Sequence, residues 1–291
     1  MDTASWLVAI RPKTLSVGAT PVLVGTAIAS WLGGMRPLAA GLALVGALLL
    51  QIASNLANDV YDFRKGADTD ERLGPVRATS SGLLSEAQMM RALALCLGAA
   101  FASGLALTAV AGWPILAIGV AGMVSAVAYT GGPYPLGYHG LGDLFVLLFF
   151  GWAAVAGTTF AQTGTWEPLA FGVGTALGCF GMAVLTVNNL RDFEGDRQVG
   201  KRTLVVRLGR ERGLQYHAML MGAPYAILAA LVARGDLPVP ALLAGLTLPG
   251  AWRLVTAVAT TTGRPLNPLL GATAKLQAGF GVLLSAGILL G

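Results

Sequence analysis

Charged residues are scarce in this chain of 291 residues, since only 11% are Asp, Glu, Lys or Arg while 55% are hydrophobic. A soluble domain usually carries about 25% charged residues. The scarcity excludes an ordinary soluble globular fold. It indicates instead a protein that crosses a membrane several times.

Cysteine and histidine are nearly absent. Cys96 and Cys179 lie in separate apolar runs, and His139 and His217 do not cluster with them. This composition gives no support to a disulfide framework, a zinc site or a haem site. The chain also lacks the basic start of a cleavable signal peptide, and we expect the first apolar stretch to be retained.

Apolar runs of about 20 residues, the length that crosses a bilayer, recur along the whole chain. The weakest of these runs, near residues 112–130, contains Pro114 and several glycines. In another run, Gly174 and Gly178 have the spacing that lets two membrane helices approach closely. The predicted fold is an all-α integral membrane protein with one domain, residues 1–291. Its nine predicted membrane spans are 14–34, 38–60, 88–110, 112–130, 142–162, 167–190, 213–233, 238–260 and 269–290.

The basic residues indicate how these spans are oriented. If the N-terminus is cytoplasmic, all 19 Lys and Arg residues except Arg36 and Arg234 fall in cytoplasmic segments. An odd number of spans then places the C-terminus outside. The net charge of +5 is thus explained by topology in a plasma or inner membrane, and it gives no reason to predict nucleic-acid binding.

The pattern N-x-x-x-D-F occurs twice, where the second and the sixth predicted spans end. Asp59 and Asp62 are three residues apart, and Asp192 and Asp196 are four apart, so each pair lies on one helical face. Hard carboxylate oxygens suit Mg²⁺, which completes its coordination with water and substrate phosphate. Ionisable groups that continue into an apolar helix are costly and usually functional. We therefore predict that the two pairs bind Mg²⁺ around a diphosphate.

Basic and amide side chains accompany both acidic motifs. Lys and Arg are natural partners of phosphate oxygens, and Asn can bridge phosphate and carboxylate. The substrate-binding residues predicted on this basis are Asn55, Asn58, Arg64, Lys65, Arg77, Asn188, Asn189, Arg197, Lys201 and Arg202.

Two further segments hold candidate substrate contacts. Arg11 and Lys13 either anchor the first span on the cytoplasmic side or bind an anionic group of a substrate. Tyr129, Tyr134 and Tyr138 flank or lie in a Gly- and Pro-rich break, where aromatic faces can attract a positively charged group. Ordinary packing is the alternative for each tyrosine.

These motifs resemble those of the UbiA superfamily of intramembrane prenyltransferases, and within it the branch that prenylates 1,4-dihydroxy-2-naphthoate in menaquinone synthesis. The two acidic runs are typical of the superfamily, and the runs at 11–15 and 129–133 are typical of the branch. The resemblance covers nearly the whole chain, and its segments are residues 11–15, 58–75, 81–83, 129–145 and 188–204.

The resemblance implies nine transmembrane helices around a central cavity, with polar cap loops on the cytoplasmic side. It implies Mg²⁺ as cofactor, and polyprenyl diphosphate, 1,4-dihydroxy-2-naphthoate and membrane lipid as partners. The diphosphate leaves, a ring carbon attacks the allylic cation, and CO₂ is lost to give a demethylmenaquinone. The four motif aspartates and Tyr134 are the expected catalytic residues. Asp68 is expected to bind metal in place of a third Asp that many relatives carry where Gly66 stands here.

Two alternatives stay open at this point. The first keeps the enzyme class and changes the acceptor to 4-hydroxybenzoate or homogentisate. The second is a transporter that couples ions to intramembrane carboxylates. Against transport, the carboxylates are predicted at one membrane face and not at the midplane.

Overall fold

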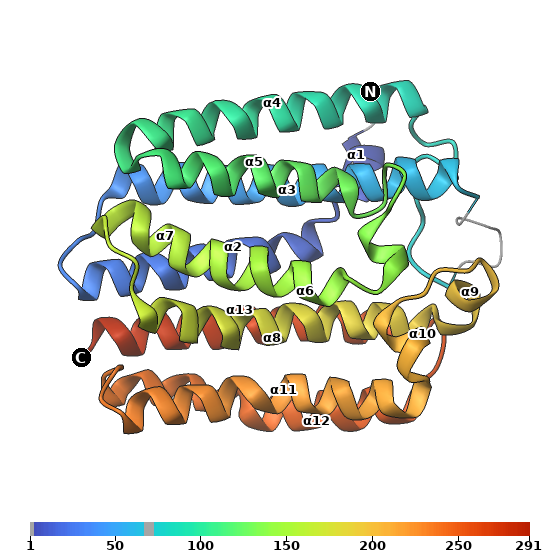
Figure 1. Cartoon of the computed structure of the whole chain (residues 1–291). Helices are drawn as coiled ribbons and strands as arrows, with labels where there is room; N and C mark the ends of the chain where they lie inside the picture. The colour runs from blue at the N-terminus through green and yellow to red at the C-terminus, as the bar shows by residue number, and fades with distance from the viewer. Residues whose placement is uncertain (1–2, 67–72) are drawn as a thin grey trace.

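The computed structural model describes residues 3–66 and 73–291, and this part of the chain is a bundle of helices without strands (Figure 1). The elements are α1 (Thr3–Ile10), α2 (Pro12–Trp31), α3 (Pro37–Arg64), α4 (Glu86–Ala111), α5 (Trp113–Ala128), η1 (Leu136–His139), α6 (Gly142–Val146), η2 (Leu147–Ala153), α7 (Ala154–Thr163), α8 (Pro168–Arg191), α9 (Phe193–Gln198), α10 (Leu204–Leu208), α11 (Arg210–Ala233), η3 (Val239–Thr247), α12 (Leu248–Thr260) and α13 (Leu266–Leu289).

The predicted all-α membrane fold is confirmed, and each of the nine predicted spans coincides with helix. Within the described residues, eight helical segments are long and apolar enough to cross a membrane. The ninth, α5, has 16 residues and is shorter than the roughly 20 that a full crossing needs. This is the segment that Pro114 and its glycines weaken, so the count of nine complete spans is not established.

Local sequence signals set several helix ends. Pro37 and Pro168 occupy first-turn positions of α3 and α8, where a missing N–H costs nothing. Ser85 and Gln88 form a reciprocal capping box at the start of α4. Gly164, with φ of 82°, ends α7 in the left-handed conformation that glycine adopts without strain.

Helices α6 and α7 form one continuous rod through the π-helical segment η2, which packs directly on α8. A Cβ placed on Gly151 of η2 would lie 2.6 Å from the carbonyl oxygen of Gly174. A Cβ on Gly178 would lie 3.4 Å from Cα of Gly151. The close helix approach predicted from Gly174 and Gly178 is therefore confirmed, with η2 as the partner.

The helices form two groups. Buried residues of α8 pack with α11, α13 and η2 in the largest apolar core, whereas α3, α4 and α5 pack on one another. Helices α9 and α10 and the segment before α4 lie at one end of the bundle, and the C-terminus lies at the other (Figure 1). The described parts of the polar segments that follow both acidic motifs thus lie at a single end of the bundle.

Candidate active site

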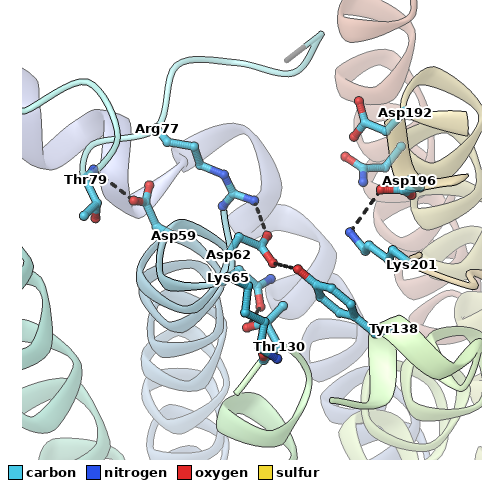
Figure 2. Close-up of polar contacts among 12 residues, drawn as sticks. Asp59, Asp62, Lys65, Arg77, Thr79, Thr130, Tyr138, Asp192, Asp196 and Lys201 are labelled. Carbon is cyan, nitrogen blue, oxygen red and sulfur yellow. Dashed lines mark hydrogen bonds and ion pairs between the residues drawn. The ribbon is translucent and has the colours of Figure 1, made fainter. Parts of the chain in front are cut away.

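Asp59 fixes the segment that follows the first acidic motif. Its side chain is fully buried. The backbone N–H of Ala78 donates to Oδ2 at 3.0 Å. That of Thr79 donates to Oδ1, also at 3.0 Å (Figure 2). Both carboxylate oxygens thus bind backbone, and Asp59 holds residues 78–79 against the end of α3.

Asp62, one turn further along α3, joins two distant side chains. Arg77 Nη2 donates to Oδ2 at 2.9 Å, and the Tyr138 hydroxyl donates to Oδ1 at 3.0 Å (Figure 2). Asp62 and Arg77 are both buried. Removing a charge pair from water is costly, and the attraction between the two partners offsets part of that cost.

The second motif is organised by Arg191, which ends α8. Its guanidinium donates to both carboxylate oxygens of Asp192, and at 2.8 Å to Asn188 Oδ1 and to Asn267 Oδ1 of α13. Asn267 in turn donates to the carbonyl of Leu73 at 2.9 Å. Our sequence analysis treated Arg191 as a topological charge and missed it as a site residue, although its place directly before Asp192 was a usable signal.

Asp196 and Lys201 form the other half of the second motif. Their Oδ1 and Nζ atoms lie 3.5 Å apart, and Asp196 Oδ2 is buried without a hydrogen-bond partner among the described residues. Burial raises the pKa of Asp196 to about 6, while Lys201 lowers it and Asp192 and Asp62 raise it. Burial lowers the pKa of Lys201, but Asp196, Asp62 and Asp192 outweigh burial and raise it. Carboxylates of both motifs therefore act on one ammonium group.

Tyr138 connects the two motifs. Its ring centroid lies 4.7 Å from Lys65 Nζ and 5.3 Å from Lys201 Nζ. Lys65 Nζ also donates to the Thr130 carbonyl at 2.5 Å, and the Thr130 hydroxyl donates to Asn58 Oδ1 at 3.0 Å. Burial lowers the pKa of Lys65, and Asp62 opposes that effect.

A cavity of about 420 Å³ opens beside these groups and continues between the helices. Its polar end lies at Asp62, Arg77 and Lys201, and its remaining wall is mostly apolar. Nine of the residues predicted as substrate or metal contacts line it, namely Arg11, Asn55, Asn58, Asp62, Arg77, Tyr129, Asn188, Asn189 and Lys201.

Arg11 reaches the cavity from a tight break between α1 and α2. It has φ of 57°, which is uncommon for a residue other than glycine. Asn55 Nδ2 donates to the Ile10 carbonyl at 2.9 Å, and Thr14 Oγ1 donates to the Arg11 carbonyl at 3.0 Å. These bonds hold a backbone conformation that is otherwise disfavoured, as is common at functional sites.

Other predicted residues do not line the cavity. Tyr134 is 58% exposed and stacks on His139 at 3.6 Å between ring centroids. Arg64 is engaged by Glu86 through two hydrogen bonds of 2.9 and 2.6 Å. The predicted phosphate contacts Arg197 and Arg202 have exposed side chains, as does Lys13, which was predicted to anchor the first span or to bind an anionic group. Asp68 lies outside the described residues.

The carboxylate oxygens of the two acidic motifs suit a hard divalent cation, although these carboxylates do not form one cluster. Among residues 3–66 and 73–291, no three His, Cys, Asp or Glu side chains lie close enough to hold a metal. Asp196 nevertheless lies 3.5 Å from Lys201, Asp62 and Asp192 act on the same ammonium group through their charge, and Asp196 Oδ2 has no partner among the described residues. Such oxygens suit Mg²⁺, which takes one or two carboxylates and fills its shell with water and phosphate.

The fold and the site define a class of protein, a helical membrane protein whose paired acidic motifs stand at the polar end of an intramembrane cavity. The chain belongs to the UbiA prenyltransferase family, whose model matches residues 19–272. Two relatives are 1,4-dihydroxy-2-naphthoate octaprenyltransferases. That of Escherichia coli (strain K12) is 46% identical over 228 residues, covering 76% of this chain and 74% of that protein. That of Haemophilus influenzae is 34% identical over 295 residues, covering 98% and 96%.

Solved structures of UbiA homologues share the fold. One from Archaeoglobus fulgidus, bound to DMAPP and Mg²⁺, gives a TM-score of 0.68 at 16% identity and covers 97% of this chain and 99% of that one. One from Aeropyrum pernix K1, in the apo state, gives 0.70 at 17% identity and covers 94% and 97%. Both similarities extend over almost the whole length of each chain.

Proposed function

We propose that this chain transfers a polyprenyl group from polyprenyl diphosphate to 1,4-dihydroxy-2-naphthoate, releasing diphosphate and CO₂ and giving a demethylmenaquinone. The observation that carries the proposal is the charge cluster at the polar end of an otherwise apolar cavity, where Asp62 pairs with Arg77, and Lys201 pairs with Asp196. An amphiphilic donor with an anionic head and a hydrocarbon tail matches that distribution. The names of the two relatives support the naphthoate as acceptor.

The head of the donor is assigned to the two acidic motifs and their cations. Asp62, Asp192 and Asp196 would hold Mg²⁺, which when bound neutralises charge on the departing diphosphate. Lys201 and Arg77 already line this end of the cavity and would bind phosphate oxygens. Asp59 takes a different role, because its oxygens accept from the backbone of residues 78–79, whereas the partners of Asp62 and Asp192 are side chains. It positions Arg77 through the segment that it anchors.

The acceptor is assigned to Arg11, Asn188 and Asn189, which all line the cavity. A guanidinium is a good partner for the ring carboxylate of a naphthoate. Tyr129 and Phe149, which also line the cavity, offer aromatic faces to an allylic cation. The apolar wall excludes water, which would otherwise capture that cation.

The bundle end that carries α9 and α10 is assigned to the cytoplasmic face of the plasma or inner membrane, together with the N-terminus. The distribution of Lys and Arg supports this orientation. The C-terminus, at the other end of the bundle, would then be outside (Figure 1). Residues 1–291 act as a single domain in this proposal.

The test is an acceptor comparison with the purified chain in lipid nanodiscs. Octaprenyl diphosphate and Mg²⁺ are supplied with 1,4-dihydroxy-2-naphthoate, 4-hydroxybenzoate or homogentisate, and prenylated products are identified by mass spectrometry. We expect a prenylated, decarboxylated product with the naphthoate. Faster prenylation of either other acceptor would overturn the assignment of the acceptor, and the absence of any prenylated product would overturn the proposal as a whole.

A further inference from the structure

The cavity has a long apolar half that the chemistry at its polar end does not require. On α3 its lining residues recur every three or four positions, from Asp62 back to Leu42. Asp62 and Leu42 are 20 positions apart. This separation is about 30 Å of helix, close to the hydrocarbon thickness of a bilayer. Gln51 is the last polar residue of this stripe, and its Oε1 is buried without a hydrogen-bond partner among the described residues. Beyond Gln51, α3 presents only apolar side chains and one glycine to the cavity.

Packed side chains form the far end of the cavity, while Phe101 and Val120, which line its side, are exposed on the outer surface of the bundle. Leu42, Leu107 and Ile115 line that end, and they belong to an apolar cluster with Ala39 and Phe160. Four of these five residues are buried, and Leu42 packs against them. A hydrocarbon chain that entered from the polar end would therefore run along α3 and meet a floor.

Three glycines from three neighbouring helices line the cavity just before this floor. Gly46 lies nine residues after the start of α3, Gly104 seven before the end of α4, and Gly119 six after the start of α5. At 1.5 Å per residue, each lies about 9 to 14 Å from the helix end on the floor side. The three glycines thus stand at one level, and we call them the glycine level.

Each of these glycines leaves space that a side chain would fill. A Cβ on Gly104 or Gly119 meets no atom within 4 Å, and one on Gly46 meets only Ser103 Oγ, at 3.9 Å. Gly104 lies on the same helical face as Leu107, and Gly119 on the same face as Ile115. Because Leu107 and Ile115 are buried, these faces are turned toward the interior of the bundle.

We propose that the glycine level determines how long a prenyl chain the enzyme accepts, with the far end of the donor's tail lying between this level and the floor. This inference rests on the proposed prenyl transfer. Asp62 lies 16 residues from Gly46, so the level is about 24 Å from the acidic motif. One prenyl unit contributes four carbon–carbon bonds, roughly 5 Å when extended. A three-unit chain stops short of the level, and an eight-unit chain passes it even when partly coiled.

The variants Gly104→Leu and Gly119→Leu test this, because each adds a side chain at the level without a steric clash at Cβ. The matched control is Gly98→Leu, on α4 as well. Gly98 is exposed, does not line the cavity, and has no atom within 4 Å of an added Cβ. Leucine has a better helix propensity than glycine, so helix formation is favoured in all three variants.

The measurement is kcat/KM for octaprenyl diphosphate and for farnesyl diphosphate, each with saturating 1,4-dihydroxy-2-naphthoate. We expect the octaprenyl-to-farnesyl ratio to fall at least tenfold in Gly104→Leu and Gly119→Leu, and to stay at the wild-type value in Gly98→Leu. If the ratio is unchanged in both test variants while farnesyl transfer persists, the tail does not pass the glycine level and the inference is wrong. If the wild-type chain transfers neither prenyl group, the proposed function itself is wrong.

Discussion

Tyr138 donates a 3.0 Å hydrogen bond to Asp62, which ties the segment after α5 to the first acidic motif. The same ring lies over Lys201, so one tyrosine contacts both halves of the proposed diphosphate site. Sequence reasoning favoured Tyr134, four residues earlier, which the structure leaves on the surface. The two tyrosines therefore form a natural test and control.

Tyr138→Phe is expected to lower kcat by about 10- to 100-fold. The variant keeps the ring but removes a hydrogen bond to a charged carboxylate, an interaction worth about 1.5–3 kcal/mol. Tyr134→Phe removes a hydroxyl that has no hydrogen bond to residues 3–66 or 73–291, and it should stay within about twofold of wild type. Steady-state kinetics of both variants measure the two losses in kcat. Equal losses would refute the special role of Tyr138.

Asp59→Asn should loosen the segment before α4 more than it weakens metal binding. Both Asp59 oxygens accept backbone N–H groups, and an amide can accept only on one side. A lost bond of this kind costs about 1–3 kcal/mol of unfolding free energy. Thermal unfolding and the rate of trypsin cleavage after Arg77 report the effect.

The matched control is Asp236→Asn, which breaks the exposed pair of Arg234 and Asp236. Exposed ion pairs contribute roughly 0–1 kcal/mol, so little change in either readout is expected. An Asp59→Asn variant as stable and as protease-resistant as this control, but with a greatly raised Mg²⁺ requirement, would show that Asp59 binds metal directly.

The apparent affinity for Mg²⁺ should weaken as the pH falls below about 6. Burial raises the pKa of Asp196 to about 6, so this carboxyl binds a proton progressively below that pH. Mg²⁺ binds the ionised form, and protons therefore compete with it, at most about tenfold per pH unit for one group. Mg²⁺ titrations of activity between pH 5 and 8 measure the effect. Asp196→Asn should bind Mg²⁺ weakly at every pH, and a wild-type pH dependence in that variant would assign the effect to another group.

The proposed orientation predicts which segments an impermeant thiol reagent can reach. Cysteines introduced at 73–80 or at 197–212, in a chain lacking Cys96 and Cys179, should react only after the cell membrane is opened. A cysteine at Arg234, between α11 and η3, should react in intact cells. Labelling of the 197–212 segment from outside intact cells would show that the orientation is the reverse of the one proposed.

The sequence predicted the helices well because membrane spans are recorded locally, as runs of apolar residues bounded by Gly, Pro and charge. It also located both acidic motifs, since each stands in a short stretch of chain. The short helix α5 marks the limit of this approach. A run weakened by Pro114 predicts a span but does not fix its length.

The roles of individual site residues were harder to predict, because they depend on contacts between distant segments. Asp59 meets residues 78–79, and Arg191 meets Asn267, 76 positions away. Arg64 is drawn to Glu86, and nothing in the spacing of either residue indicates that pairing. Residue type and position therefore predicted nine of the side chains that line the cavity, but not which of them position others.

The most direct test of the two-motif site is the turnover of Asp62→Ala and Asp192→Ala, measured with Mg²⁺ and both substrates varied. Each change removes a carboxylate that compensates charge on the departing diphosphate, so the loss should appear mainly in kcat. We expect a fall on the order of 10²-fold or more in each variant, and no turnover of the wild-type chain in excess EDTA. If both variants fold and keep a kcat close to wild type, the two acidic motifs do not form the catalytic metal site, and this account of the protein is contradicted.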